Sequence, residues 1–201
     1  DIIENHYGLA LDELIQQRFY KSIGANYSTY HPLNKFSKAQ IIPTEEDTYF
    51  RFKTVHGYVH DMGAAMQNGI GGHAGLFSNA NDVAKLMQMY LQHGFYGGKQ
   101  YLSSQTVDAF NTCYYCAQDN RRGLGFDKPQ LEDEGPTCGC LSMTSFGHSG
   151  FTGTFAWADP EQEIIYVFLS NRTYPDASNN RLLNENIRTE IQRLIYEAIT
   201  E

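Results

Sequence analysis

A nine-residue stretch, Phe146-Gly-His-Ser-Gly-Phe-Thr-Gly-Thr154, combines one imidazole and three hydroxyls with three glycines. Small residues at a strand edge let a ligand lie against the backbone and accept hydrogen bonds from its amides. The imidazole of His148 can hold an anion or move a proton near neutral pH, and the hydroxyl of Ser149 can donate or accept a hydrogen bond. The stretch is the first candidate for a substrate site, and an edge strand that tolerates glycine is the structural alternative.

Four cysteines form the second candidate site. They occur as two close pairs, Cys113-Tyr-Tyr-Cys116 and Cys138-Gly-Cys140. Four thiolates in two pairs about 20 residues apart could bind zinc tetrahedrally, whereas in an exported protein the same residues would form disulfides. We expect disulfides or free thiols in preference to zinc, and either arrangement would brace the loop that precedes the His148 segment.

Three histidines raise the question of another metal site. His56 and His60 would share one face of a helix, with His73 as a third ligand. Gly57 and the surrounding aromatic residues argue against a helix there, so we expect no metal at these histidines. We likewise expect the adjacent arginines at 121–122 to be a solvated charge pair rather than an anion site.

The elements that must position these residues follow from hydrophobic periodicity and from helix stop signals. Helices are expected over residues 9–23 (ended by Gly24), after Ser78, after Ser103 (a shorter one) and near 179–200 at the close of the chain. Strands are expected over 151–157 and 164–169. Residues 25–60 should be irregular with short strands, and residues 112–145 should form a loop. The apolar stripe of the closing helix contains Leu183, Ile187, Ile191, Leu194, Ile195 and Ala198. A hairpin followed by such a helix predicts an α+β fold in which helices flank an antiparallel sheet.

Composition limits the class of protein. The chain has 201 residues, 41% of them hydrophobic, and a formal net charge of −8, which suits one soluble domain over residues 1–201. An acidic chain repels phosphate backbones and anionic lipid, so we expect no nucleic-acid partner and no membrane-surface role. No apolar run approaches the roughly 20 residues of a membrane span. Because the chain opens at Asp1 without a leader, we interpret it as a fragment of a longer protein.

Five segments resemble, in order, the penicillin-recognising serine hydrolases of the serine β-lactamase and DD-peptidase type. His148-Ser149-Gly150 resembles the Lys-Thr-Gly strand of that family in its variant with His in place of Lys. Ile2–Gly24 resembles the helix after the family's Tyr-x-Asn element. Gly72–Ser78 with Asn81–Leu86 resembles a turn of the family that leads into a helix. Trp157–Pro160 and Val167–Asn171 resemble the two strands that follow the Lys-Thr-Gly strand. Each match alone is weak, but five in one order are specific.

The resemblance implies roles for four residues. His148 would hold a substrate carboxylate or adjust proton transfer, and Ser149 would hydrogen-bond the same group next to Gly150. The backbone N–H of Phe151 would form half of an oxyanion hole, which stabilises charge developing on the attacked carbonyl. The nucleophile's own N–H would form the other half.

The sequence departs from the family where the attack should occur. No serine is followed by Lys three residues later, so the Ser-x-x-Lys nucleophile motif is absent, and Tyr-x-Asn is absent too. The resemblance therefore implies a β-lactamase/transpeptidase-like domain lacking its N-terminal part and inactive as the isolated chain. A sheet without partner strands would expose its edges, and a homodimer could cover them.

We expect the parent to be an exported or periplasmic serine hydrolase that needs no cofactor and acts on a small β-lactam, ester or cell-wall peptide. The alternatives are a non-catalytic cell-wall-binding module and a structural module braced by zinc. Val59-His-Asp61 and Gly72-His-Ala-Gly75 also resemble relatives fused to β-N-acetylhexosaminidase-like glycoside hydrolases, which suggests cell-wall recycling.

Overall fold

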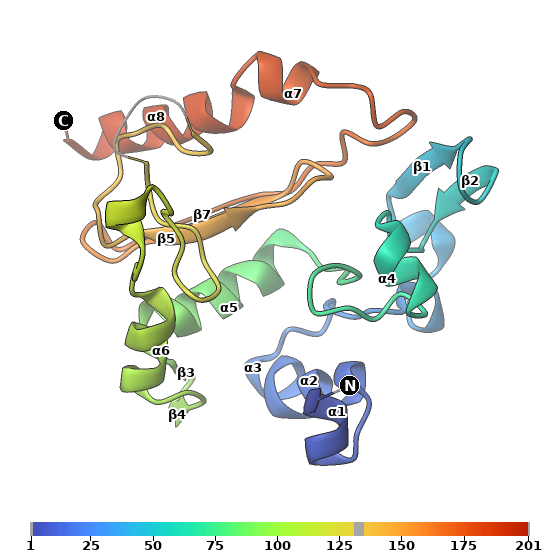
Figure 1. Ribbon diagram of the computed structural model, residues 1–201, viewed down its shortest axis with the longest axis horizontal. Helices are drawn as coiled ribbons and strands as arrows, with labels where there is room; N and C mark the ends of the chain where they lie inside the picture. Colours follow the sequence, from blue (N-terminus) through green and yellow to red (C-terminus); the bar gives the residue numbers. More distant parts are fainter. Residues whose placement is uncertain (1, 131–134, 201) are drawn as a thin grey trace. The chain divides into compact units, whose positions relative to one another are not determined.

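The computed structural model describes residues 2–130 and 135–200, and the chain divides into two compact units (Figure 1). The first unit holds Asp1–Asp82 and Ser170–Asn179, and the second holds Val83–Leu169 and Asn180–Glu201. Helices and antiparallel strand pairs occur in both units, which confirms the predicted α+β class. Among the described residues, no helix has the length and apolar character that a membrane crossing requires.

The first unit begins with helices. After α1 (Ile2–Tyr7), a continuous helical run is formed by α2 (Leu11–Ile15), the π-helical η1 (Gln16–Tyr20) and α3 (Lys21–Ile23). Gly24 ends this run with a φ of 75°, a left-handed conformation that glycine adopts without steric cost. The run and its stop agree with the helix predicted over residues 9–23.

A small hairpin lies in the segment predicted to be irregular. β1 (Pro43–Asp47) pairs antiparallel with β2 (Lys53–His56). The buried carboxylate of Asp47 accepts hydrogen bonds from the backbone N–H groups of residues 49–51 at 2.8–3.1 Å, and it forms an ion pair of 2.7 Å with Arg51. These bonds fix the turn of the hairpin. The helix α4 (Met62–Met66) follows, with Asp61 as its N-cap.

The second unit is built on a three-stranded antiparallel sheet in the order β5-β6-β7. The strands are β5 (Phe146–Ser149), β6 (Phe155–Asp159) and β7 (Ile164–Phe168). On one face, Met87 of α5 (Ala80–Leu91) packs with Phe146 and Ala158; on the other, α8 (Ile187–Thr200) contributes Ile195 to a cluster around Trp157. Figure 1 shows these helices on opposite faces of the sheet. The sheet is thus flanked by helices, as predicted.

The short elements complete the chain. They are η2 (Pro32–Asn34) and η3 (Lys38–Gln40) in the first unit, and β3 (Phe95–Tyr96), β4 (Lys99–Gln100), α6 (Ser104–Asn111), η4 (Cys116–Gln118) and α7 (Arg181–Asn184) in the second. Ser103 caps α6, the shorter helix expected after it, whereas Asn79 rather than Ser78 bonds the first turn of α5. The closing helix is divided because Asn186 adopts a left-handed φ of 51° between α7 and α8.

The face of α8 that meets the sheet is polar, which the sequence did not predict. Arg188, Gln192 and Tyr196, here called the polar stripe, are spaced four residues apart and are 8%, 1% and 8% exposed. By contrast, Leu194 of the predicted apolar stripe is 62% exposed, and Leu183, Ile191 and Ala198 are exposed too, so the prediction was wrong for these four. The polar stripe is buried because the loops at both ends of β6 offer it hydrogen-bonding groups.

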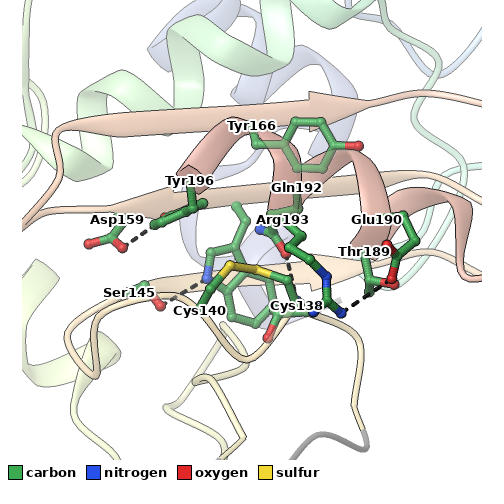
Figure 2. Close-up of a disulfide and its surroundings, with 12 residues drawn as sticks. Cys138, Cys140, Ser145, Asp159, Tyr166, Thr189, Glu190, Gln192, Arg193 and Tyr196 are labelled. Atoms are coloured by element: carbon green, nitrogen blue, oxygen red, sulfur yellow. Dashed lines mark hydrogen bonds and ion pairs between the residues drawn. A yellow bond between two sulfur atoms is a disulfide. The ribbon is translucent and has the colours of Figure 1, made fainter. Parts of the chain in front are cut away.

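Two of these bonds are visible in Figure 2. The hydroxyl of Tyr196 donates to the carboxylate of Asp159 at 2.8 Å, and the side-chain oxygen of Gln192 accepts the backbone N–H of Cys138 at 3.0 Å. Burial raises the pKa of Asp159, but hydrogen bonds from Ser142, Tyr196 and Gln162 outweigh burial and leave that pKa below its ordinary value. Burial beside this carboxylate also raises the pKa of Tyr196.

Strand β5 is held from both sides. It pairs with β6 along its length, and on its other side Asp127 exchanges two backbone hydrogen bonds with Gly147, at 2.8 and 3.1 Å. The carboxylate of Asp127 is itself paired with Arg121 at 3.3 Å and Arg122 at 3.1 Å. We expected the two arginines to be a solvated charge pair. Instead, they hold the segment that lines the outer side of β5.

Gly147 is the point where β5 meets the largest core side chain. Its register partner in β6 is Trp157, which is fully buried and donates from its indole nitrogen to Ser145 Oγ at 3.1 Å. A Cβ at Gly147 would overlap the Trp157 ring and the carbonyl oxygen of Ala156. The glycine is required because the indole ring occupies the space over its α-carbon.

We predict that Gly147→Ala lowers the free energy of unfolding by about 1–3 kcal/mol, the usual cost of overpacking a core. Urea denaturation followed by the fluorescence of Trp157, the single tryptophan of the chain, measures this directly. Gly72→Ala is the matched control, because a Cβ at Gly72 meets nothing within 4 Å. Equal effects of the two substitutions would contradict the packing argument.

We predict that Tyr196→Phe destabilises the protein by about 1.5–3 kcal/mol at neutral pH, because it removes one buried hydrogen bond to a charged carboxylate. Since the pKa of Asp159 is lowered in the folded state, this stabilisation is present above the ordinary carboxyl pKa of 3.8 and is lost as the pH falls below it. The difference between wild type and variant should therefore shrink in acid. Tyr114→Phe, at a 53% exposed tyrosine, should change the urea midpoint little at any pH.

Candidate functional site

The predicted substrate segment lies at the end of β5. His148 and Ser149 are the last residues that pair with β6, opposite Ala156 and Phe155. The imidazole of His148 is exposed, and its Nδ1 lies 2.7 Å from the carbonyl oxygen of Ser149. The structure therefore presents the imidazole at the surface, next to the point where the strand gives way to a turn.

A tight turn carries the other two predicted residues. The N–H of Gly150 donates to the carbonyl of Thr154 at 2.8 Å, and the N–H of Gly153 donates to the carbonyl of Gly150 at 3.0 Å. Phe151 lies in this turn and is 64% exposed, so the prediction that a strand begins at Phe151 was wrong. Gly150 and Gly153 allow a reversal that a regular strand cannot make: a Cβ at Gly150 would overlap Thr154 Oγ1, and Gly153 has a φ of 102°.

The segment carries polar groups but no Ser-x-x-Lys motif. An imidazole, a hydroxyl and the backbone of a glycine-rich turn can contact a carboxylate or a polarised carbonyl. The hydroxyl of Ser149 is followed three residues later by Thr152, where a Ser-x-x-Lys motif would need lysine. The four residues named from the sequence are thus brought together in one exposed strand end and turn.

The cysteines are paired locally. One disulfide joins Cys113 to Cys116 and the other joins Cys138 to Cys140, with Cα–Cα distances of 5.6 and 5.3 Å. A zinc site of four thiolates would need all four sulfurs reduced and directed at one ion, and here each sulfur is bonded to its neighbour. The Cys138–Cys140 loop is tied to α8 through Gln192 (Figure 2) and lies a few residues before β5, so it braces the loop as expected.

The histidines considered for metal binding have different partners. Nε2 of His56 lies 2.6 Å from the carbonyl oxygen of Ile41, and His73 lies 3.1 Å from Asp61. His60 lies 3.4 Å from the buried Glu45. Within residues 2–130 and 135–200, no group of three or more His, Cys, Asp or Glu side chains is arranged to hold a metal ion.

Two residues that contact the candidate site were not predicted from the sequence. Asp127 holds the outer side of β5, and Arg188 reaches the Thr154 carbonyl with its Nη1 at 3.2 Å. Asp127 lies in a stretch with loop composition, and Arg188 lies on a helix whose hydrophobic pattern points elsewhere. No local pattern marks either residue, because their roles depend on contacts across 20 and 34 positions of the chain.

Comparison with known proteins identifies the family and the fold. The β-lactamase family profile matches residues 1–187. A protein of Escherichia coli O157:H7, provisionally assigned as a D-alanyl-D-alanine carboxypeptidase, is 36% identical over 191 residues, which are 89% of this chain and 44% of that protein. A Salmonella enteritidis PT4 protein with the same provisional assignment is 34% identical over 199 residues, 92% of this chain and 45% of its own.

Solved structures show the same fold at lower identity. A β-lactamase from Mycobacterium bovis superposes with a TM-score of 0.62 and 16% identity, covering 99% of this chain and 60% of that one. Simvastatin synthase from Aspergillus terreus superposes with a TM-score of 0.63 and 17% identity, covering 97% and 51%. The chain spans less than half the length of the curated relatives described above. The family match, the relatives and the solved structures together show that the chain belongs to the β-lactamase family and has the β-lactamase/transpeptidase-like fold.

Proposed function

We propose that this chain is the substrate-binding C-terminal portion of a β-lactamase-like serine hydrolase. The observation that carries the proposal is the exposed end of β5, where His148 and Ser149 lead directly into the Gly150–Thr154 turn. In a family whose members bind a substrate along such a strand, this arrangement would hold the substrate by its polar groups. The imidazole and the Ser149 hydroxyl bind the carboxylate, and the Phe151 N–H contributes to the oxyanion hole.

The isolated chain is inactive in this proposal. Acyl transfer needs an activated hydroxyl, and this sequence contains neither Ser-x-x-Lys nor Tyr-x-Asn. The attacking group would come from a part of the protein outside these residues. A cell-wall-binding module without turnover is the second candidate, and the missing nucleophile favours it for the chain taken alone.

The substrate class is a cell-wall peptide or a related small ester or amide. The provisional carboxypeptidase assignment of the E. coli and Salmonella relatives supports a peptide ending in D-alanyl-D-alanine. The histidine in place of the family's lysine favours an esterase or peptidase over a resistance enzyme. Fusion to a glycoside hydrolase stays a prediction.

The proposed compartment is exported or periplasmic. Disulfides persist in oxidising compartments and are rare in the reducing cytosol, and both cysteine pairs of this chain form disulfides. The zinc-braced module, the other alternative, would require breaking both disulfides before the metal could bind.

We predict that the chain binds a peptide ending in D-alanyl-D-alanine without forming a covalent adduct with penicillin. Titration followed by amide chemical shifts should move the signals of residues 148–151, and mass spectrometry should find no acylated serine. His148→Ala should weaken binding about tenfold, since one charge-assisted hydrogen bond is worth about 1.4 kcal/mol or more. His6→Ala, at an exposed histidine of α1, is the control. Absence of any shift would reject the binding role, and stoichiometric penicillin labelling would reject the inactivity.

Self-association through the sheet edge is a further part of the proposal. β7 pairs with β6 on one side, and no described strand pairs with it on the other. Leu169, directly after β7, is 38% exposed. A strand edge without a described partner, beside an exposed apolar residue, is a template for pairing with a second copy.

We predict a concentration-dependent dimer in sedimentation velocity, and Leu169→Lys should weaken it at least about tenfold because a charge opposes edge pairing. Leu124→Lys is the matched control, at a 59% exposed leucine distant in sequence from the sheet edge. A wild-type chain that stays monomeric at every concentration would refute the dimer.

A further inference from the structure

The turn after β5 is tied to α8 by a buried cation. Arg188 is only 8% exposed, and its Nη1 donates to the carbonyl oxygen of Thr154 at 3.2 Å. The guanidinium also lies over the ring of Phe155, 5.7 Å from the ring centre. Burying a guanidinium is unfavourable unless its N–H groups are satisfied, so its position is specified by the groups that it contacts.

The carbonyl that Arg188 contacts is the one that closes the turn. Thr154 O accepts the N–H of Gly150 at 2.8 Å as well as the Arg188 donor. A carbonyl with two donors has both lone pairs engaged, and its direction is fixed more strongly than by either bond alone. The orientation of the peptide groups between Gly150 and Thr154, including that of Phe151, is set by this closure.

Arg188 is also anchored at its own backbone. Its carbonyl oxygen accepts the hydroxyl of Tyr166, from β7, at 3.2 Å. The side chain therefore reaches the turn from a residue whose main chain is already fixed to the sheet. A short side chain at this position would leave the Thr154 carbonyl with the Gly150 N–H alone, while the rest of α8 would keep its bonds through Gln192 and Tyr196.

We propose that Arg188 is a positioning residue for the substrate-binding turn: it sets the Gly150–Thr154 turn through the Thr154 carbonyl and so orients the backbone at Gly150 and Phe151. Its importance for substrate rests on the proposed function, whereas its effect on the turn does not. The residue acts through the backbone and need not touch the substrate.

The test compares Arg188→Met, which has no hydrogen-bond donor, with Arg188→Lys by amide hydrogen exchange. Arg188→Met should speed exchange at Gly150 at least about tenfold more than at the β6–β7 amides, which report general loss of stability. Arg188→Lys should restore part of the protection, because the ammonium can still donate to Thr154. Arg193→Met, at an exposed arginine of the same helix that pairs with Glu190 at 3.2 Å, should leave Gly150 unchanged. If Gly150 and the β6–β7 amides respond equally in Arg188→Met, the proposal is overturned.

A measurement on the wild-type chain covers the case in which the variants do not fold. The guanidinium Nη protons of Arg188 should exchange slowly in NMR spectra, unlike those of the exposed Arg181. Fast exchange at Arg188 would overturn the proposal. Titration with the D-alanyl-D-alanine peptide separates the two ideas: peptide binding that fails while the Gly150 result holds would reject the proposed function and leave the positioning role intact.

Discussion

The contact between Trp157 and Gly147 is the constraint on which the second unit depends. The indole ring crosses the α-carbon of the neighbouring strand, so β5 can pair with β6 only in the register that places glycine opposite the ring. Because side chains alternate along a strand, a shift by one residue would move His148 to the opposite face of the sheet. Burial of one aromatic ring therefore decides which side chains reach the surface at the end of β5.

The polar stripe of α8 extends this control to the loops around β6. Arg188 reaches the turn before the strand, and Tyr196 reaches Asp159 at its end. Gln192 reaches the loop closed by the Cys138–Cys140 disulfide. A purely apolar face would stabilise the helix on the sheet without direction, because hydrophobic contact is not directional. Hydrogen bonds are directional, so the stripe aligns the helix and ties it to two loops and to the end of β6.

This arrangement suits the binding role proposed for the chain. Strand β5 is held on one side by β6 and on the other by the Asp127 bridge at Gly147, while the His148 side chain is exposed. Binding residues on a rigid strand lose little freedom when a ligand arrives, which favours affinity. Catalysis in this family would need in addition a hydroxyl activated by a base, and this sequence contains no Ser-x-x-Lys motif.

The sequence by itself determined the fold class, the family and the candidate segment Phe146–Thr154. Helical periodicity located α5, α6 and the run ending at Gly24, and five ordered segments between Ile2 and Asn171 pointed to the family that the comparisons confirm. These features are local, carried by neighbouring residues and short spacings. Only the tertiary structure decided that Arg188, Gln192 and Tyr196 would face the sheet in place of Leu194, and that Phe151 would lie in a turn. The physical reason is that a polar side chain can be buried only where it finds hydrogen-bonding partners. Here those partners are distant in sequence, and no local pattern encodes their positions.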